Sequence, residues 1–331
     1  MLIVRAIRGD DFHGLMALAQ LVGAGMTTLK PDAHTLARRI EIACASFAGT
    51  LPIEECDYLF VMEDAIVGKL VGVCAIKAAV GLTEPFYNYR IGTLVHSSAE
   101  LKVFTRMDTL YLSNDLTGCA ELCSLFLHPD YRTGSNGRLL SKSRFLFIAQ
   151  FPHLFGPKLI AELRGFLSDD GRSPFWDSLG RHFFKMEFDR ADDLTGLGKK
   201  SFIAELMPRH PLYVAHLSEA AQAAIGKTHV ATAPARRLLE QEGMHFESYV
   251  DIFDAGPVLQ ARVADLRAVR ESSLDASAAT PALVSNTDPH DFRVIVADAL
   301  PLNNAALAAL ACRVGEPVRS MSLNPPKVHH V

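Results

Sequence analysis

The chain has 331 residues and a formal net charge of −4, which excludes a broad basic surface for nucleic acid or anionic lipid. Hydrophobic residues make up 49% and charged residues 21%, which excludes disorder as the main state and indicates one large globular domain or two. An anionic ligand must therefore be held by a local group of residues.

Cysteine usage and the N-terminus indicate a cytoplasmic protein. The first residues carry charge from Arg5 onward and lack the continuous apolar core of a signal peptide. The longest apolar stretch, residues 71–82, contains Lys77 and is far shorter than the ~20 residues that a membrane-spanning helix needs. The six cysteines show no paired spacing, which favours free thiols in a reducing compartment: 44, 56, 74, 119, 123 and 312.

Apolar periodicity and turn residues predict a mixed order of elements. Strands are expected at 2–7, 58–62, 70–76, 120–128 and 158–163, with further β structure at 84–97 and 101–112. Helices are expected after Asp10 and Asp11, at 32–47 and at 137–150. Two short helices are expected to end at Gly180 and Gly243, because glycine favours the position that follows a helix.

The composition changes after Asp254. Residues 271–290 are rich in Ser, Ala, Thr, Asp and Pro, which is typical of a surface linker. Short β-like runs at 292–296 and 317–323 and a helix at 304–312 follow. The sequence therefore predicts an α+β fold with two parts, a main domain over 1–265 and a linker with a small β-rich C-terminal region over 266–331.

The segment 121–137, ELCSLFLHPDYRTGSNG, carries the strongest local signal. A strand, a polar turn with glycine and a helix N-terminus form a nest of backbone N–H groups that suits a pyrophosphate. Gly137 lets the backbone approach a phosphate, and Arg132 adds a charged donor. The turn alone is equally typical of an ordinary strand-to-helix connection, and it lacks the Gly-Lys-Ser/Thr of a P-loop.

The order of elements and this segment resemble the GNAT type of acyl-CoA-dependent N-acyltransferases, whose pattern LxVxPxxRxxGxG holds the CoA pyrophosphate. Leu125, Leu127, Arg132 and Gly137 match that pattern, while Ser135 replaces its first glycine. Longer runs, such as YNYRIGTLVHSS at 87–98 and SPFWDSLGRHFFKMEF at 173–188, resemble the arginine N-succinyltransferase family over about residues 2–265.

This resemblance implies a GNAT-like, mostly antiparallel sheet flanked by helices, with residues 1–265 as the acyltransferase domain. It also implies an acyltransferase that moves the succinyl group of succinyl-CoA to the α-amino group of L-arginine in bacterial arginine catabolism. Succinyl-CoA would be a cosubstrate, with no permanently bound cofactor, and the chain would form a homodimer or a heteromer with a related subunit. The implied CoA-binding residues are Leu125, Leu127, Arg132, Ser135, Asn136 and Gly137.

The family pattern GxxHxxTxPA places a catalytic histidine, the implied proton donor, at His229 in GKTHVATAPA. A histidine suits that role because its ordinary pKa is ~6.5. Glu121 is a candidate base that would deprotonate the amine through water, although a solvated charge at the end of a strand explains it as well. Tyr131 is a candidate proton donor to the thiolate, although an aromatic ring packed beside Pro129 explains it as well. Cys123 is a less favoured acyl-carrying nucleophile, since no histidine adjoins it in the sequence.

Charged side chains in the family-like runs are candidates for binding the substrates. Cations for the two substrate carboxylates are Arg90, Lys142 and Arg164, and carboxylates for the guanidinium are Asp115, Glu162 and Glu205. No metal site is expected, because the Cys119, Cys123 and His128 spacing lies in an apolar strand and is better explained by buried thiols.

Two other functions stay open from the sequence. The chain could be a subunit of a heteromeric arginine/ornithine succinyltransferase that is not catalytic alone. It could also use another acyl donor or another amine, such as ornithine.

Overall fold

The computed structural model describes residues 1–22, 26–196, 201–275 and 277–325. Its described strands form one 13-stranded sheet with the order β13-β11-β12-β1-β2-β3-β6-β7-β10-β9-β4-β5-β8. Neighbouring strands are antiparallel, except that β6 and β7 are parallel. The strands are β1 (Leu2–Ala6), β2 (Asp57–Asp64), β3 (Lys69–Lys77), β4 (Asn88–Ser98), β5 (Val103–Ser113), β6 (Ala120–Leu127), β7 (Lys158–Glu162), β8 (Leu212–Tyr213), β9 (His245–Val250), β10 (Pro257–Arg262), β11 (Ala282–Ser285), β12 (Arg293–Ala297) and β13 (Arg319–Ser322).

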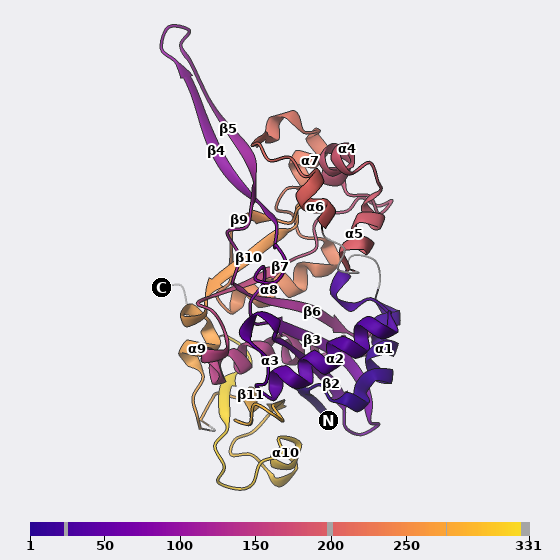
Figure 1. Cartoon of the computed structure of the whole chain (residues 1–331). Coiled ribbons are helices and arrows are strands. Elements are labelled where there is room, and N and C mark those ends of the chain that lie inside the picture. Colours follow the sequence, from indigo (N-terminus) through magenta and orange to yellow (C-terminus); the bar gives the residue numbers. More distant parts are fainter. Residues whose placement is uncertain (23–25, 197–200, 276, 326–331) are drawn as a thin grey trace.

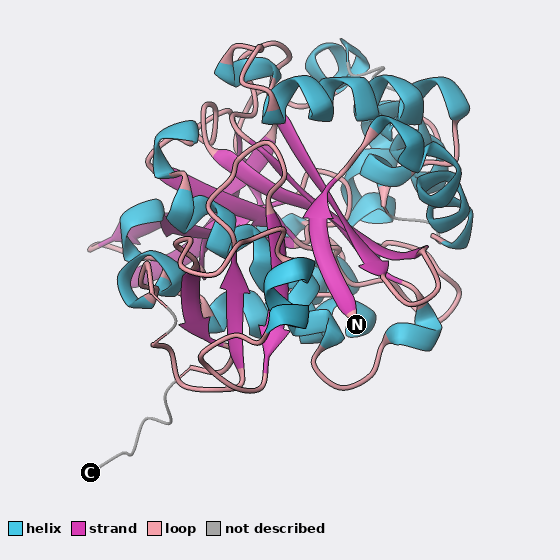
Figure 2. Ribbon diagram, turned by 90° about the horizontal axis from the view of Figure 1, so that it is seen from below, coloured by secondary structure: helices cyan, strands magenta, loops and turns pink. Residues whose placement is uncertain are grey.

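Helices cover both faces of this sheet (Figure 2). They are α1 (Phe12–Leu21), α2 (Ala33–Phe47), α3 (Asn136–Gln150), α4 (Arg181–Phe184), α5 (Phe188–Gly196), α6 (Ser201–Leu206), α7 (Glu219–Ala224), α8 (Ala233–Gln241), α9 (Arg267–Glu271) and α10 (Asn304–Ala309). Because successive strand residues point to opposite faces, Leu59 and Val61 pack with α1 and α2, whereas Phe60 and Met62 pack with α3. The expected mixed and mostly antiparallel sheet with flanking helices is confirmed.

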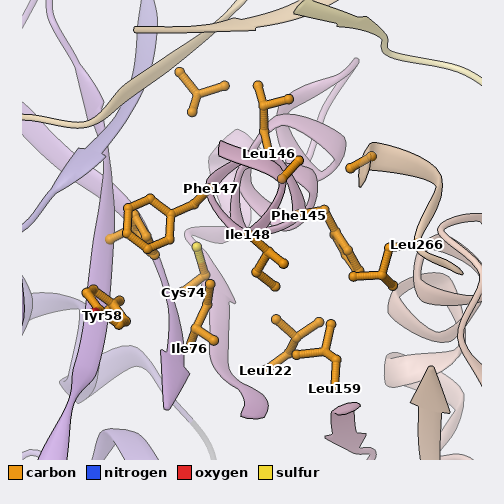
Figure 3. Packing of buried hydrophobic residues seen from close by; sticks show 14 of the residues in the cluster. Tyr58, Cys74, Ile76, Leu122, Phe145, Leu146, Phe147, Ile148, Leu159 and Leu266 are labelled. Atoms are coloured by element: carbon orange, nitrogen blue, oxygen red, sulfur yellow. The ribbon is translucent and has the colours of Figure 1, made fainter. Parts of the chain in front are cut away.

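Helix α3 lies inside the largest hydrophobic cluster (Figure 3). The ring of Phe147 has its centroid 5.1 Å from that of Phe60 in β2 and 4.9 Å from that of Phe292, just before β12. The helix therefore has neighbours on the sheet side and on the side of the C-terminal region. For this reason even the polar run 141–144 is buried.

Most predicted elements are present, and their ends have local causes. The helix expected at 32–47 begins where the carboxylate of Asp32 accepts a hydrogen bond from the N–H of Thr35 at 2.8 Å. The hairpin of β2 and β3 turns at Gly68, whose φ of +63° favours glycine. Gly243 also has a positive φ, of +98°, after α8.

Two expectations from the sequence are wrong. The chain stays helical through Gly180, which ends a π-helical turn (Trp176–Gly180) and leads into α4. A Cβ at Gly180 would lie 2.3 Å from the ring of Trp176, so this glycine serves close packing. The expected linker at 271–290 contains β11, whose Leu283 and Val284 are fully buried.

The C-terminal region extends the main sheet. Strand β12 pairs with β1 through Val4 and Val294, and β11 and β13 continue the sheet outward. The ammonium group of Lys142 in α3 donates a hydrogen bond to the carbonyl of Leu323 at 3.0 Å. The division of the chain into a main domain over 1–265 and a C-terminal region over 266–331 stays a prediction.

Strands β4 and β5 form a long arm that projects from the body of the molecule (Figure 1). Their register runs from Asn88↔Ser113 to Ser98↔Val103. Only Tyr89 and Arg90 of β4 pair with β9, and only the base of β5 pairs with β8. Near the tip, Leu101 and Phe104 are each 73% exposed.

None of the helices that the structure describes is both long and apolar enough to cross a membrane.

Candidate active site

The two parallel strands separate soon after they meet. Strands β6 and β7 pair only through Ala120↔Leu159 and Glu121↔Ile160. Beyond this point a pocket of about 1860 Å³ opens between them, lined by residues 121–127 of β6 and 161–164 of β7 and its continuation. The sheet therefore holds an opening at its centre, where a ligand can meet backbone groups that no neighbouring strand covers.

A bulge in β6 faces this opening. Val73 pairs with Phe126 and Ala75 with Cys123, so two residues of β6, Ser124 and Leu125, face one residue of β3. Ser124 has a φ of +54°, which is strained for a residue with a side chain.

Arg39 of α2 holds the bulge in place. Its Nη1 donates to the Ser124 hydroxyl at 2.9 Å, and its Nε donates to Asp57 at 2.8 Å. All three side chains are buried, so the strained bulge is fixed by a charge pair within the core.

The predicted phosphate cradle lies at the start of α3. The first helical hydrogen bond there runs from the N–H of Leu139 to the carbonyl of Ser135 at 2.9 Å, so the N–H groups of Gly137 and Arg138 precede the hydrogen-bonded ladder. A Cβ added at Gly137 would meet no atom within 4 Å. These N–H groups and the positive end of the helix dipole form a site for an anion.

The side chains of this turn support the cradle. Arg132, an exposed residue, donates from Nε to the carbonyl of Leu127 at 2.9 Å, and its guanidinium carbon lies 5.6 Å from the centre of the Phe126 ring. Ser135 makes no side-chain cap bond and has a φ of −98°, so it fits the helix start in place of glycine. Asn136 donates to the carbonyl of Tyr131 at 2.9 Å.

Four of the six predicted CoA-binding residues, Leu125, Leu127, Arg132 and Gly137, line the same pocket. Ser135 and Asn136 shape the turn but are not among the residues that line the pocket.

Carboxylates gather at the pocket on the side away from α3. Glu121 and Glu162 alternate with Leu122 and Ala161, which pack in the α3 cluster, so the two acids point to the opposite face. Glu162 accepts a hydrogen bond from the amide of Asn88 at 2.6 Å. Burial, together with the nearby charges of Asp251 and Glu121, raises the pKa of Glu162 well above its ordinary value.

Two further acids, Asp251 and Asp254, come from the loop after β9 and also line the pocket. Asp254 accepts hydrogen bonds from the N–H groups of Gly165 at 2.7 Å and Gly256 at 2.8 Å. Burial, and then the charge of Asp251, raises the pKa of Asp254 well above its ordinary value. This wall of acids is suited to a cationic substrate.

His229 lies beside the continuation of β7. Its N–H donates to the carbonyl of Arg164 at 2.8 Å, and its Nδ1 accepts from the N–H of Ala231 at 3.1 Å. Because Nδ1 is an acceptor, the neutral imidazole carries its proton on Nε2. Arg164 and Ala231 line the pocket, while His229 itself stands at its margin. Burial and the charge of Arg164 lower the pKa of His229.

The other charged candidates lie in different places. Arg164 and Glu162 line the pocket. Arg90 and Asp115 contact each other at 3.8 Å in an exposed pair, and Glu205 is exposed on α6. These last three do not line the pocket.

Lys142 is fully buried in a pair with Glu242 at 2.9 Å, away from the pocket. Tyr131 donates to Asp64 at 3.2 Å and also lies outside the pocket lining. Burial raises the pKa of the Cys123 thiol to about 11, which disfavours its thiolate and hence a nucleophilic role. No described group of three or more His, Cys, Asp or Glu side chains is placed to hold a metal ion.

Sequence reasoning missed Arg39, Asp251 and Asp254. Both aspartates lie in YVDIFDAGP at 249–257, which is another of the runs that resemble the arginine N-succinyltransferase family, so the resemblance was the available signal for them. Arg39 lies in a helix far from β6 in the sequence and carries no local signal.

A parallel pair that splays within an antiparallel sheet, followed by a turn and a helix N-terminus that line one pocket, defines an acyltransferase of the GNAT type. Residues 2–268 match the family described as arginine N-succinyltransferase beta subunit. The chain belongs to the arginine N-succinyltransferase family, and it is an acyltransferase that acts on small molecules.

Relatives match along nearly the whole chain. The arginine N-succinyltransferases of Citrobacter koseri and Enterobacter sp. (strain 638) are each 49% identical to it, with 98% of both chains covered. A solved structure, that of arginine/ornithine succinyltransferase subunit AI from Pseudomonas aeruginosa, is 34% identical with a TM-score of 0.88, covering 98% of this chain and 99% of that one. The expected GNAT-like fold is thereby confirmed.

Proposed function

We propose that the chain transfers the succinyl group of succinyl-CoA to the α-amino group of L-arginine and releases CoA and N2-succinyl-L-arginine. One observation carries this proposal: a single pocket joins a helix N-terminus suited to a pyrophosphate with a wall of carboxylates suited to a cation. The name of the relatives, arginine N-succinyltransferase, supports arginine as the acceptor and a succinyl group as the group transferred.

The donor would lie along β6 and the start of α3. The CoA pyrophosphate would accept hydrogen bonds from the N–H groups of Gly137 and Arg138, with Arg132 as a charged donor. The pantetheine arm would pass Leu127 and bring the thioester to Leu125, where the bulge exposes the backbone. Ser135 and Asn136 would hold the turn.

The acceptor would enter from the carboxylate side. Glu121, Glu162, Asp251 and Asp254 would bind the guanidinium and the ammonium group of arginine. The amine must lose one proton before it attacks the thioester carbon, and a carboxylate at the end of the β6–β7 pairing is placed to take it. Glu162 is favoured for this step because its raised pKa makes it a stronger base than an ordinary carboxylate.

We propose His229 as the proton donor of the reaction. After the amine attacks, the carbon–sulfur bond breaks and negative charge develops on sulfur. The Nε2 proton of His229 would pass to the sulfur as this bond breaks, and in the same step the new amide nitrogen would return a proton to Nε2, so that CoA leaves as the thiol. A histidine with a lowered pKa is neutral at pH 7 and keeps this tautomer.

A CoA-release assay tests the function. The purified chain would be offered succinyl-CoA or acetyl-CoA with arginine, ornithine or lysine, and the acylated product would be identified by mass. We expect a strong preference for succinyl-CoA and arginine. Comparable kcat/KM for acetyl-CoA would refute the donor, and a preference for ornithine would refute the acceptor.

A second candidate function is that of a subunit in a heteromeric arginine/ornithine succinyltransferase. The likeness to a protein described as subunit AI favours it. Full activity of the purified chain alone would exclude this candidate.

We also propose that the chain assembles as a homodimer or with a related subunit, through the β4–β5 arm. The exposed Phe104 and the open strand edges of the arm support an interface there. Light scattering of the purified chain tests this: a monomer at all concentrations would refute the homodimer.

A cytoplasmic location is proposed from the six cysteines, all of which are free.

A further inference from the structure

Arg144 is a buried cation in the middle of α3 that lines the pocket. It is 2% exposed. Its Nε donates to the carbonyl of Ser141 at 3.3 Å, its Nη1 to the carbonyl of Cys123 at 3.4 Å, and its Nη2 to the hydroxyl of Ser141 at 3.3 Å. All three acceptors are neutral, and all three distances exceed those of ordinary N–H···O bonds.

This lack of a counter-ion sets Arg144 apart from the other buried basic residues of the described chain. Arg5 pairs with Asp11 at 2.7 Å and Arg39 with Asp57 at 2.8 Å. Lys142 and Arg267 share Glu242, at 2.9 and 2.8 Å.

Arg144 alone in this set has no described carboxylate within 4.0 Å. Burial lowers its pKa, and the only ionisable groups that oppose this shift are the thiols of Cys74 and Cys123. A guanidinium remains charged in proteins, so the uncompensated burial destabilises the free protein. An anion that enters the pocket would supply the missing partner.

The position of Arg144 suits the acyl group rather than the phosphates. Its contact with the carbonyl of Cys123 lies directly before the bulge at Ser124 and Leu125, where the thioester is placed. It also approaches β6 from the α3 side, whereas Glu121 and Glu162 point to the other face. The guanidinium of Arg144 and the carboxylates of Glu121 and Glu162 therefore lie on opposite sides of β6, the first suited to an anionic donor and the second to a cationic acceptor.

We propose that Arg144 binds the free carboxylate of a dicarboxylic acyl group while the thioester lies at the β6 bulge. This inference rests on the proposed function, and it makes Arg144 the residue that selects succinyl-CoA over donors with an uncharged acyl chain. The planar guanidinium can meet both carboxylate oxygens at once.

The test compares two donors of equal chain length. Butyryl-CoA replaces the succinyl carboxylate with a methyl group and changes nothing else. In Arg144→Met, which preserves much of the side-chain length, kcat/KM for succinyl-CoA should fall about 10²- to 10³-fold, because a desolvated charge loses its partner. The value for butyryl-CoA should stay equal or rise.

Arg164→Met is the matched control, because Arg164 is another arginine at the same pocket. It should change the rates with both donors by the same factor. If Arg164→Met removes the succinyl preference and Arg144→Met keeps it, the inference is overturned while the function stands. If the unaltered protein shows no preference for succinyl-CoA, the proposed function has failed instead.

A second measurement needs no variant and therefore does not depend on the folding of Arg144→Met. The unaltered protein would be crystallised with the 3-carboxypropyl thioether of CoA, which cannot transfer its chain. The carboxylate should lie within 3.2 Å of the Arg144 guanidinium, the normal limit for such a bond. A carboxylate held by Arg164, or facing solvent, would overturn the inference.

Discussion

The change Gly137→Ala should move stability and cofactor binding in opposite directions. Gly137 is the second residue of α3, and a Cβ there would meet no atom within 4 Å. Alanine is favoured over glycine in a helix by about 0.5–1 kcal/mol, so the free variant should be more stable by up to that amount. For a chain of this size the melting temperature should rise by about 1–3 °C.

The same methyl group should weaken binding of the acyl-CoA. The space that is empty of protein atoms at Gly137 is where a phosphate would approach the helix N-terminus. If the methyl prevents that approach, Kd for CoA and KM for succinyl-CoA should rise about tenfold or more, which equals about 1.4 kcal/mol. KM for arginine should change little, because the carboxylates proposed to bind it lie at the β6–β7 pairing and in the loop after β9, not at the start of α3.

Thermal unfolding and calorimetric titration with CoA measure the two effects. Gly9→Ala is the matched control, since a Cβ at Gly9 also meets no atom within 4 Å and Gly9 is not among the residues that line the pocket. The control should leave CoA affinity unchanged. A more stable Gly137→Ala protein with unchanged affinity for CoA would refute the phosphate cradle, and a less stable one would refute the packing argument.

Three further predictions follow from the site and the core. His229→Ala should lower kcat about 10²- to 10⁴-fold with CoA affinity intact; near-normal kcat would contradict the assignment. The variant should also lose the fall in kcat expected below pH 6.5, where protonation of Nδ1 breaks the hydrogen bond from the N–H of Ala231 that orients the ring. The unfolding free energy should fall less between pH 5 and pH 8 in Glu162→Gln than in the unaltered protein. A carboxyl whose pKa is raised by folding stabilises the protein fully below its unfolded pKa, and that contribution is lost as the pH rises through the folded pKa. An equal fall in both proteins, measured by denaturation at each pH, would contradict this. Glu242→Gln should destabilise the chain by about 3–5 kcal/mol in urea unfolding, since Lys142 and Arg267 would lose their shared carboxylate; a change below about 1 kcal/mol would show that the pair is not important.

Features that depend on neighbouring residues could be predicted from the sequence. The cap at Asp32 and the turn at Gly68 follow from local backbone chemistry, and both are present. The strand, turn and helix around Arg132 and Gly137 are also contiguous in the chain, so their side of the pocket was predicted as a unit. The role of each residue there stays a prediction.

Features that depend on distant segments could not be predicted in this way. The run Ser-Lys-Ser-Arg at 141–144 has the composition of an exposed face, yet it is buried because the C-terminal region covers α3. Arg39 and Arg144 therefore carried no signal, although they reach the β6 bulge from two opposite sides. Gly180 matches the pattern of a residue that follows a helix. The pattern does not show that the Trp176 ring packs against this glycine and leaves no room for a Cβ.

The place of β1 between β2 and β12 has a consequence for how the chain reaches this fold. One of the two sheet neighbours of β1 lies nearly three hundred residues later in the chain, since Val4 pairs with Val294. Until that neighbour emerges, the outer edge of β1 is open and the ammonium group of Lys142 lacks the carbonyl of Leu323. Contacts that span so much sequence slow folding. A chain shortened to the matched residues 2–268 would therefore keep every residue of the pocket except its last two, while it would lose β12, the strand that pairs with β1.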